Sequence, residues 1–216
     1  MLLLAVDTSG RQGGVTLARG GSDRFEVIES ASIEGGTFSA ELIPQIAQLL
    51  TNHSLTPQQL NGLVAVTGPG SFTGLRVGLT AVKGLAEVLS LPISTVTALE
   101  VLMAVFHNDT EGIAVIDAGR GEVYVRLMRD GSAEEILLSI VKAEDLAKSH
   151  NARVMTGDAK LASKFTNAVV IEDRSSEIAA RIGLKKLLAG DTVDVLALDA
   201  NYIRKSEAEY MQKLKR

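Results

Sequence analysis

Short hydrophobic runs separated by glycine-containing turns open the chain, and they predict three β-strands, at residues 2–6, 14–18 and 25–33. A helix is expected next, at residues 39–53, because hydrophobic side chains recur there at the i, i+3, i+4, i+7 spacing of one helical face. Pro44 fits this helix only in its first turn, since a proline deeper in a helix removes a backbone hydrogen bond.

A strand at residues 63–66 and a hydrophobic helix at residues 74–89 form the next unit. The helix carries hydrophobic or small residues on nearly every side, which is typical of a helix that is central in a core or covered by a partner. Each glycine within a helix costs about 1 kcal/mol, so glycines at this spacing indicate close packing against another element. That element belongs either to the chain's own core or to another chain. The small residues concerned are Gly74, Gly78, Ala81 and Gly84.

The second half repeats the opening order in miniature. Thr97 and Glu100 have the spacing of a capping box, which starts a helix that extends to about Phe106. A strand then ends in Asp117 and is followed by its hairpin partner. The elements expected after Phe106 are strands at 112–116, 122–129, 153–156 and 168–171, and helices at 142–149, 160–165 and 175–188.

No linker rich in proline, serine or charge separates the two halves. We therefore expect an α/β protein with an N-terminal subdomain at residues 1–100, which holds the two long helices, and a smaller C-terminal α/β subdomain at residues 101–216.

Composition narrows the range of functions. The chain has 216 residues, of which 46% are hydrophobic and 22% charged, so it is globular. It has no cysteine, which excludes disulfides and thiolate chemistry and fits a reducing compartment. A net charge of −4 argues against a protein that grips nucleic-acid phosphates along one face. No stretch approaches the roughly 18 uninterrupted apolar residues of a membrane span, so we expect a cytoplasmic protein with no membrane partner.

The candidate functional loop spans residues 68–76, with the sequence Gly-Pro-Gly-Ser-Phe-Thr-Gly-Leu-Arg. Its glycines allow positive φ angles and close backbone approach, and Ser71 or Thr73 can cap the helix that follows. An anion, a nucleotide or another protein could bind there. The alternative is that the loop only connects a strand to a helix.

This loop and Asp7-Thr8-Ser9 at the end of the first strand resemble the TsaB (YeaZ) family, whose members are bacterial subunits of the machinery that makes threonylcarbamoyladenosine (t6A) in tRNA. The resemblance runs along most of the chain. One departure is Phe38, which stands where TsaB sequences often have histidine. The other matching segments are Ser39-x-x-Leu42-x-Pro44, Asp117-Ala118 followed by Glu122-Val123-Tyr124, and Tyr202-x-Arg204.

The resemblance implies the actin/hexokinase/Hsp70-like (ASKHA) fold, which consists of two similar α/β subdomains. In active members of that superfamily, an aspartate at the first hairpin positions Mg²⁺ or water, and glycine-rich backbone cradles phosphates. After Asp117, however, the turn lacks consecutive glycines and a hydroxyl residue. We therefore expect no cofactor of the chain's own, and ATP or ADP only at a partner interface. The candidate nucleotide-binding residues are Asp7, Thr8, Ser9, Gly68, Gly70 and Ser71.

Catalytic groups are scarce in the sequence. The three histidines are far apart and unpaired, and no thiol could complete a metal site, whereas TsaD proteins, the catalytic relatives of TsaB, carry a paired-histidine metal motif. A nucleophile elbow needs Gly-x-Ser-x-Gly, but Pro69 and Thr73 flank Ser71 in place of its glycines. We expect no metal and no catalytic residue.

The resemblance thus implies a noncatalytic subunit required for t6A modification, which binds and activates a TsaD-type threonylcarbamoyltransferase together with a TsaE-type ATPase. tRNA would be contacted through the complex. The helices at 39–53 and 74–89 would pack against the matching pair of TsaD, or against a second copy as a homodimer. The interface candidates are Leu42, Ile46, Leu49, Arg76, Leu79 and Val82.

Two other functions stay open at this point. One is a small-molecule kinase or ATPase of the actin-like superfamily, and the other is a homodimeric scaffold with no role in tRNA modification.

Overall fold

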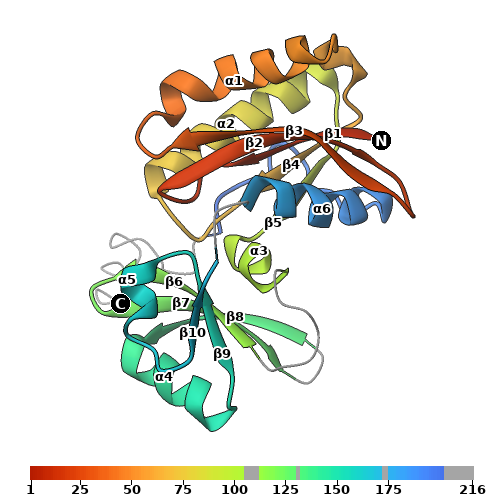
Figure 1. Ribbon diagram of the computed structural model, residues 1–216. Helices are drawn as coiled ribbons and strands as arrows, with labels where there is room; N and C mark the ends of the chain where they lie inside the picture. Colours follow the sequence, from red (N-terminus) through yellow and green to blue (C-terminus); the bar gives the residue numbers. More distant parts are fainter. Residues whose placement is uncertain (105–111, 130–131, 172–174, 202–216) are drawn as a thin grey trace, which may run out of the picture.

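The first five strands form one mixed sheet with the order β3-β2-β1-β4-β5 (Figure 1). β1 pairs antiparallel with β2 and parallel with β4, and every residue of β1 and β4 is buried, as expected for strands covered on both faces. The computed structural model describes residues 1–104, 112–129, 132–171 and 175–201. The strands are β1 (Leu2–Asp7), β2 (Gln12–Gly20), β3 (Phe25–Glu34), β4 (Gly62–Val66) and β5 (Ile93–Val96).

Helices cover both faces of this sheet. α1 (Phe38–Asn52) and α2 (Phe72–Leu89) lie side by side on one face, and a 3₁₀ turn at Pro57–Gln59 and the strand β4 lie between them in the chain. α6 (Ser175–Leu188) covers the other face. No helix in the described part of the chain is long and apolar enough to cross a membrane.

The second sheet repeats the first in strand order and direction. Counted from the antiparallel edge, each sheet runs third, second, first, fourth, fifth strand, with the last two parallel to the first. This repetition confirms the prediction of two similar α/β subdomains. The elements are β6 (Gly112–Gly119), β7 (Glu122–Arg129), β8 (Ser132–Ser139), α4 (Ile140–Ser149), β9 (Arg153–Thr156), α5 (Ala159–Ala162) and β10 (Ala168–Val170).

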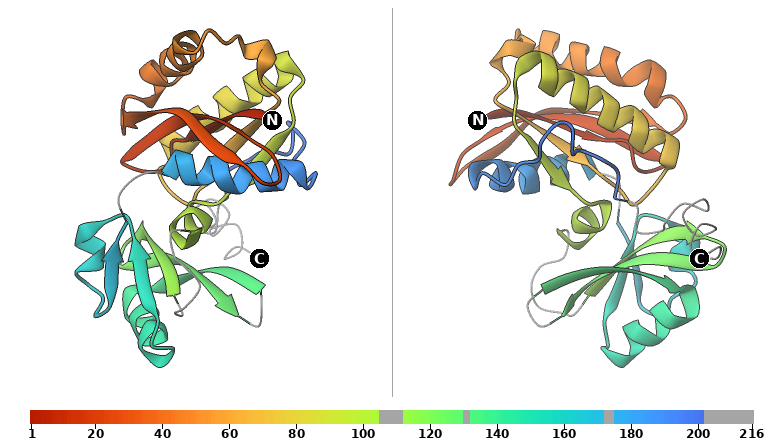
Figure 2. Two further views of the ribbon diagram at one scale, coloured as in Figure 1. Left: turned by 45° about the vertical axis from the view of Figure 1, so that its right-hand side comes forward. Right: turned by 180° about the vertical axis from the view of Figure 1, so that it is seen from behind.

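α3 (Ala98–Ala104) lies at the seam between the two sheets, as both views of Figure 2 show. The sequence places α6 with residues 101–216, but α6 packs on the first sheet, with Gly183 directly against Val64 of β4. Hydrophobic spacing shows which face of a helix is buried but not which sheet it covers. The N-terminal unit therefore includes this helix from the second half of the chain.

Three local details differ from the sequence-based expectations. Pro44 lies inside α1, beyond its first turn, and is tolerated where the helix surface faces solvent. β5 was not predicted, and it forms by pairing in parallel with β4. β8 was not predicted because Glu134 and Glu135 interrupt its hydrophobic pattern, although the strand pairs with β7 along its whole length.

Replacing either of two buried serines by alanine should change the free energy of unfolding, in opposite directions. Ser94 lies in β5 beside Val64, and its Oγ has no hydrogen-bond partner among the described residues. We expect Ser94→Ala to raise the free energy of unfolding by about 1 kcal/mol, because it removes an unpaired buried hydroxyl. The control is Ser176→Ala. It removes a 2.8 Å hydrogen bond to Thr16 and should lower the free energy of unfolding by about 1 kcal/mol.

Urea unfolding of the two variants and the parent measures both effects. A loss of stability in Ser94→Ala would contradict the assignment of an unpaired hydroxyl.

Candidate functional site

The turn after β1 directs its polar groups back into the chain. Asp7 ends β1 and is only 2% exposed. Its Oδ1 accepts hydrogen bonds from the Ser9 backbone N–H at 2.8 Å and from the Ser9 hydroxyl at 2.7 Å. Aspartates close turns in this way by binding the backbone two residues on. One oxygen of the Asp7 carboxylate is thus engaged within its own turn.

The same turn packs tightly against the glycine loop and α2. The Thr8 hydroxyl donates a 2.8 Å hydrogen bond to the carbonyl of Gly74, and the Ser71 N–H donates one of 2.7 Å to the carbonyl of Ser9. A Cβ atom at position 70, 74 or 78 would lie 2.2 Å from Ser9 O, Thr8 O or Thr8 Oγ1, respectively. Glycine is required at these three positions because the turn occupies the space where a side chain would begin.

The remaining loop residues complete a strand-to-helix connection. Gly68 has a φ of +96°, which favours glycine, and its carbonyl accepts a 2.7 Å hydrogen bond from the Ala98 N–H. Ser71 is the N-cap of α2, and its Oγ accepts from the Gly74 N–H at 3.2 Å. Of the two residues predicted as possible caps, Ser71 and Thr73, Ser71 is the one that caps α2.

The six nucleotide-binding candidates do come together, and their hydrogen bonds are with one another and with neighbouring residues such as Gly74 and Ala98. Asp7, Thr8, Ser9 and Gly68 are buried, whereas Gly70 and Ser71 lie at the surface. The glycine-rich backbone of the loop faces the chain's own turn so closely that a Cβ atom at position 70 or 74 would lie 2.2 Å from a turn carbonyl. The four buried residues lie within this contact, and nucleotide binding by the six residues stays a prediction.

The interface candidates need correction. The five aliphatic side chains all lie in the hydrophobic core between α1, α2 and the first sheet, because the hydrophobic stripe of an amphipathic helix covers the sheet beneath it. They are Leu42, Ile46, Leu49, Leu79 and Val82. Arg76 is exposed, and its guanidinium lies 3.9 Å from the centroid of the Phe72 ring, in cation–π geometry.

The residues on the outward side of these helices, which we call the outer face of α1 and α2, are not among the predicted interface residues. Ile43 on α1 is 55% exposed, and Phe72 and Val88 on α2 are 52% and 82% exposed. Gly84 of α2 is exposed as well, and a Cβ atom added there would meet nothing within 4 Å. Gly84 was the residue in the sequence that could have indicated this face. A glycine lowers helix stability, and at Gly84 no packing within the described chain requires one.

Phe38, at the position of the family histidine, is a packing residue. It is buried at the start of α1, and its ring lies over Gly13 and Gly74. Its ring atoms would be 3.0 Å from a Cβ at position 13 and 3.3 Å from one at position 74. The aromatic ring thus fills the space above two glycines and fixes α1 against α2.

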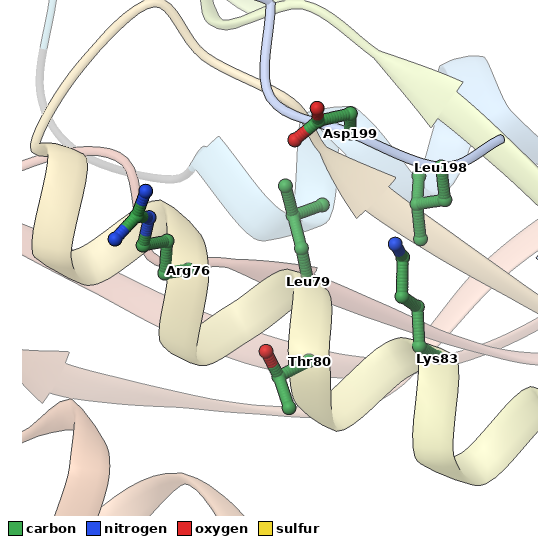
Figure 3. A pocket seen from close by; sticks show the side chains of 6 residues that line it. All are labelled: Arg76, Leu79, Thr80, Lys83, Leu198 and Asp199. Atoms are coloured by element: carbon green, nitrogen blue, oxygen red, sulfur yellow. The ribbon is translucent and has the colours of Figure 1, made fainter. Parts of the chain in front are cut away.

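A small groove lies between α2 and the segment that follows α6 (Figure 3). Its volume is about 200 Å³, below the roughly 300–1,000 Å³ of typical small-molecule sites. Leu79 and Leu198 are its buried residues, and cationic and acidic side chains stand around them. The lining residues are Arg76, Leu79, Thr80, Lys83, Leu198 and Asp199.

The second hairpin offers little to a ligand. Asp117 was predicted to end its strand but lies within β6, which continues to Gly119. Asp117 is exposed, and its Oδ1 accepts a 2.9 Å hydrogen bond from the Gly119 N–H at the end of the same strand. Among the described residues, no three His, Cys, Asp or Glu side chains cluster as a metal site would require. His53 pairs with Glu29 at the surface, at 2.8 Å, whereas His107, like Tyr202 and Arg204, lies outside the described residues.

Comparison with known proteins gives consistent matches. A family model described as TsaD, tRNA N6-adenosine threonylcarbamoyltransferase, matches residues 33–198. The tRNA threonylcarbamoyladenosine biosynthesis protein TsaB of Bacillus subtilis is 31% identical over 97% of this chain and 96% of its own. The TsaB protein of Haemophilus influenzae is 35% identical over 57% of this chain and 52% of its own.

Solved structures confirm the fold. YeaZ from Pseudomonas aeruginosa has a TM-score of 0.73 at 20% identity, covering 93% of this chain and 99% of that one. The activator of 2-hydroxyisocaproyl-CoA dehydratase from Clostridium difficile, solved with bound ADPNP, has a TM-score of 0.54 at 9% identity, covering 88% and 97%. The fold is of the ASKHA type, as predicted.

Two glycines of α2 test the packing of the turn. Gly78→Ala places a Cβ 2.2 Å from Thr8 Oγ1, so we expect it to lower the free energy of unfolding by about 1–3 kcal/mol. Gly84→Ala is the matched control on the same helix. It should raise the free energy of unfolding by up to about 1 kcal/mol, because alanine has the higher helix propensity and its Cβ meets nothing.

Thermal or urea unfolding of both variants measures the difference. Equal effects at the two positions would mean that the turn does not constrain α2.

Proposed function

The chain belongs to the TsaB (YeaZ) family, and from that premise we propose that it is a noncatalytic subunit required for t6A modification of tRNA. In this proposal it binds and activates a TsaD-type threonylcarbamoyltransferase and acts together with a TsaE-type ATPase. The match of the TsaD family model over residues 33–198 supports homology between the chain and the proposed partner. tRNA is contacted through the complex, in the cytoplasm.

The filled glycine loop is the observation that carries the noncatalytic role. In a phosphate-binding protein, backbone N–H groups of such a loop point at the ligand. Here the Ser71 N–H is bonded to Ser9 O, the Gly74 N–H to Ser71 Oγ, and the Thr8 side chain lies against Gly78. The loop serves to seat α2 on the turn, and this disfavours the small-molecule kinase or ATPase.

The outer face of α1 and α2 is the proposed docking surface for the partner. Exposed aliphatic side chains at Ile43 and Val88 offer apolar area, and the bare backbone at Gly84 allows a partner helix to approach closely. A second copy of the chain could cover the same surface, so a homodimer and the heterodimer would compete for it.

A nucleotide shared with the partner would have little of this chain to contact. Of the six candidates, only Gly70 and Ser71 are exposed, at the rim of the loop. We therefore propose that ATP or ADP at the partner interface, where present, is held mainly by the partner. The isolated chain is expected neither to bind nor to hydrolyse Mg–ATP.

Reconstituted transfer tests the role directly. Purified TsaD-type and TsaE-type proteins with the threonylcarbamoyl adenylate and tRNA should form t6A only when this chain is added, and the chain alone should form none. Product formation that is independent of the chain would refute the proposal. Steady ATP hydrolysis by the isolated chain would favour the kinase or ATPase in its place.

A second prediction concerns the docking surface. Val88→Glu adds a charge to a side chain that is 82% exposed, so the fold should keep its stability to within about 0.5 kcal/mol. Association with the TsaD-type partner should weaken roughly tenfold or more, because a buried charge at an interface lacks a partner.

Val141→Glu is the control, since Val141 is 70% exposed on α4 of the other unit. Titration calorimetry with the partner measures the affinity, and equal affinities of the two variants would place the interface elsewhere. A charge at Leu79 would not serve this purpose, because that side chain is in the core.

A further inference from the structure

Four charged side chains of alternating sign line up across the seam between the two units. Lys186 of α6 lies 3.1 Å from Glu100 of α3, and Glu100 lies 3.7 Å from Arg126 of β7. Arg126 in turn lies 2.7 Å from Glu135 of β8. The row contains two cations and two carboxylates, so its charge is balanced within the seam.

Both ends of the row are fixed by further hydrogen bonds. The Lys186 ammonium also donates to the carbonyl of Thr95 at 2.9 Å. Glu135 accepts from the Thr97 hydroxyl at 2.6 Å and from the Asn201 side-chain amide at 2.9 Å. The members of the row thus come from α6, which packs on the first sheet, from α3 at the seam and from two strands of the second sheet.

The four side chains are partly buried, so water and salt screen their ion pairs less than they would at an exposed surface. Their exposed fractions range from 14% for Glu135 to 27% for Lys186. Isolated surface ion pairs contribute little, but partly buried pairs that share partners in a network are less screened by salt and more fixed in geometry. Moving one unit relative to the other would separate Arg126 and Glu135 from Glu100 and Thr97 and leave partly buried charges without partners.

We propose that the row Lys186–Glu100–Arg126–Glu135 is a clamp that holds the two units at one fixed angle. Hinge closure around a ligand requires two packed units to change their angle at low cost. The clamp opposes that change, so the fold of this chain works as a rigid body. This inference stands apart from the role in t6A modification, since a rigid or a mobile seam is compatible with a noncatalytic subunit.

The clamp also connects to the glycine loop. Thr97, which bonds Glu135, is followed by Ala98, whose N–H donates to the carbonyl of Gly68. Asn201, the other donor to Glu135, uses its backbone N–H to bond the carbonyl of Thr67, at 2.7 Å. The second sheet is thereby held against the strand-to-helix connection that positions α2.

The chain contains no cysteine, so two introduced cysteines can carry spin labels without interference. We choose Lys185→Cys on α6 and Asp145→Cys on α4, both exposed and in different units. Pulsed electron paramagnetic resonance then measures the distance distribution between the units. The labelled parent is expected to show one narrow maximum.

Arg126→Met removes the centre of the clamp. It leaves Glu100 with Lys186, and Glu135 with Thr97 and Asn201, so each carboxylate keeps a donor and the fold should survive. We expect this variant to lose the single narrow maximum and give a broad distribution. Glu135→Gln, which removes a charge and keeps the shape, should do the same and decides the matter if Arg126→Met does not fold.

Lys148→Met is the matched control, because it removes an ion pair of 3.0 Å with Glu144 that lies within α4. Its distance distribution should equal that of the parent. A broad distribution in the parent, or an unchanged narrow one in both clamp variants, would overturn the proposal. Measurement of t6A formation by the same variants keeps this result separate from the proposed function.

Discussion

The rest of the structure depends on three glycines in the loop and α2, at positions where a Cβ atom would collide with the turn after β1. Gly70, Gly74 and Gly78 let the turn after β1 approach α2 to a distance that no other residue allows. The Thr8 hydroxyl uses this proximity to bond the Gly74 carbonyl. Phe38 then packs over the same glycine and places α1 beside α2. The position of both helices, and hence of their outer face, follows from this one contact.

Much of the architecture could be predicted from the sequence, because local patterns determine it. The Thr97–Glu100 capping box forms as expected, with hydrogen bonds of 2.7 and 3.0 Å, and Ser71 caps α2. The repeated strand order could be predicted from Asp7 of β1 and Asp117 of β6, because each is followed by a turn and a second strand. Two strands, β5 and β8, were missed. β5 forms by pairing with β4, and β8 carries two glutamates that interrupt its hydrophobic pattern, so both depend on pairing with strands from elsewhere in the chain.

The candidate site was less predictable, because a hydrophobic stripe or a glycine does not reveal what covers it. Leu42 on α1 and Leu79 on α2 each belong to the hydrophobic stripe of their helix, and both stripes pack against the chain's own sheet. The glycine loop has the composition of a phosphate cradle, and its space is taken by Thr8 and Ser9. Gly183 of α6 is a similar case. Its close contact with Val64 shows which sheet the helix covers, and this contact depends on the return of the chain to the first unit.

The glycines of α2 therefore separate into two groups once the fold is known. Gly74 and Gly78 are explained by the turn, and their cost in helix propensity is offset by the packing they permit. Gly84 has the same cost and no packing within the described chain that offsets it. Val88, one turn further on, is almost fully exposed, which adds a second unfavourable feature on the same side of the helix. A partner helix would remove both costs at once, since it would cover the valine and use the close approach that the glycine allows. Gly84 and Val88, which no packing within the described chain accounts for, are thus better guides to a partner than the hydrophobic stripes of α1 and α2, which are buried in the core.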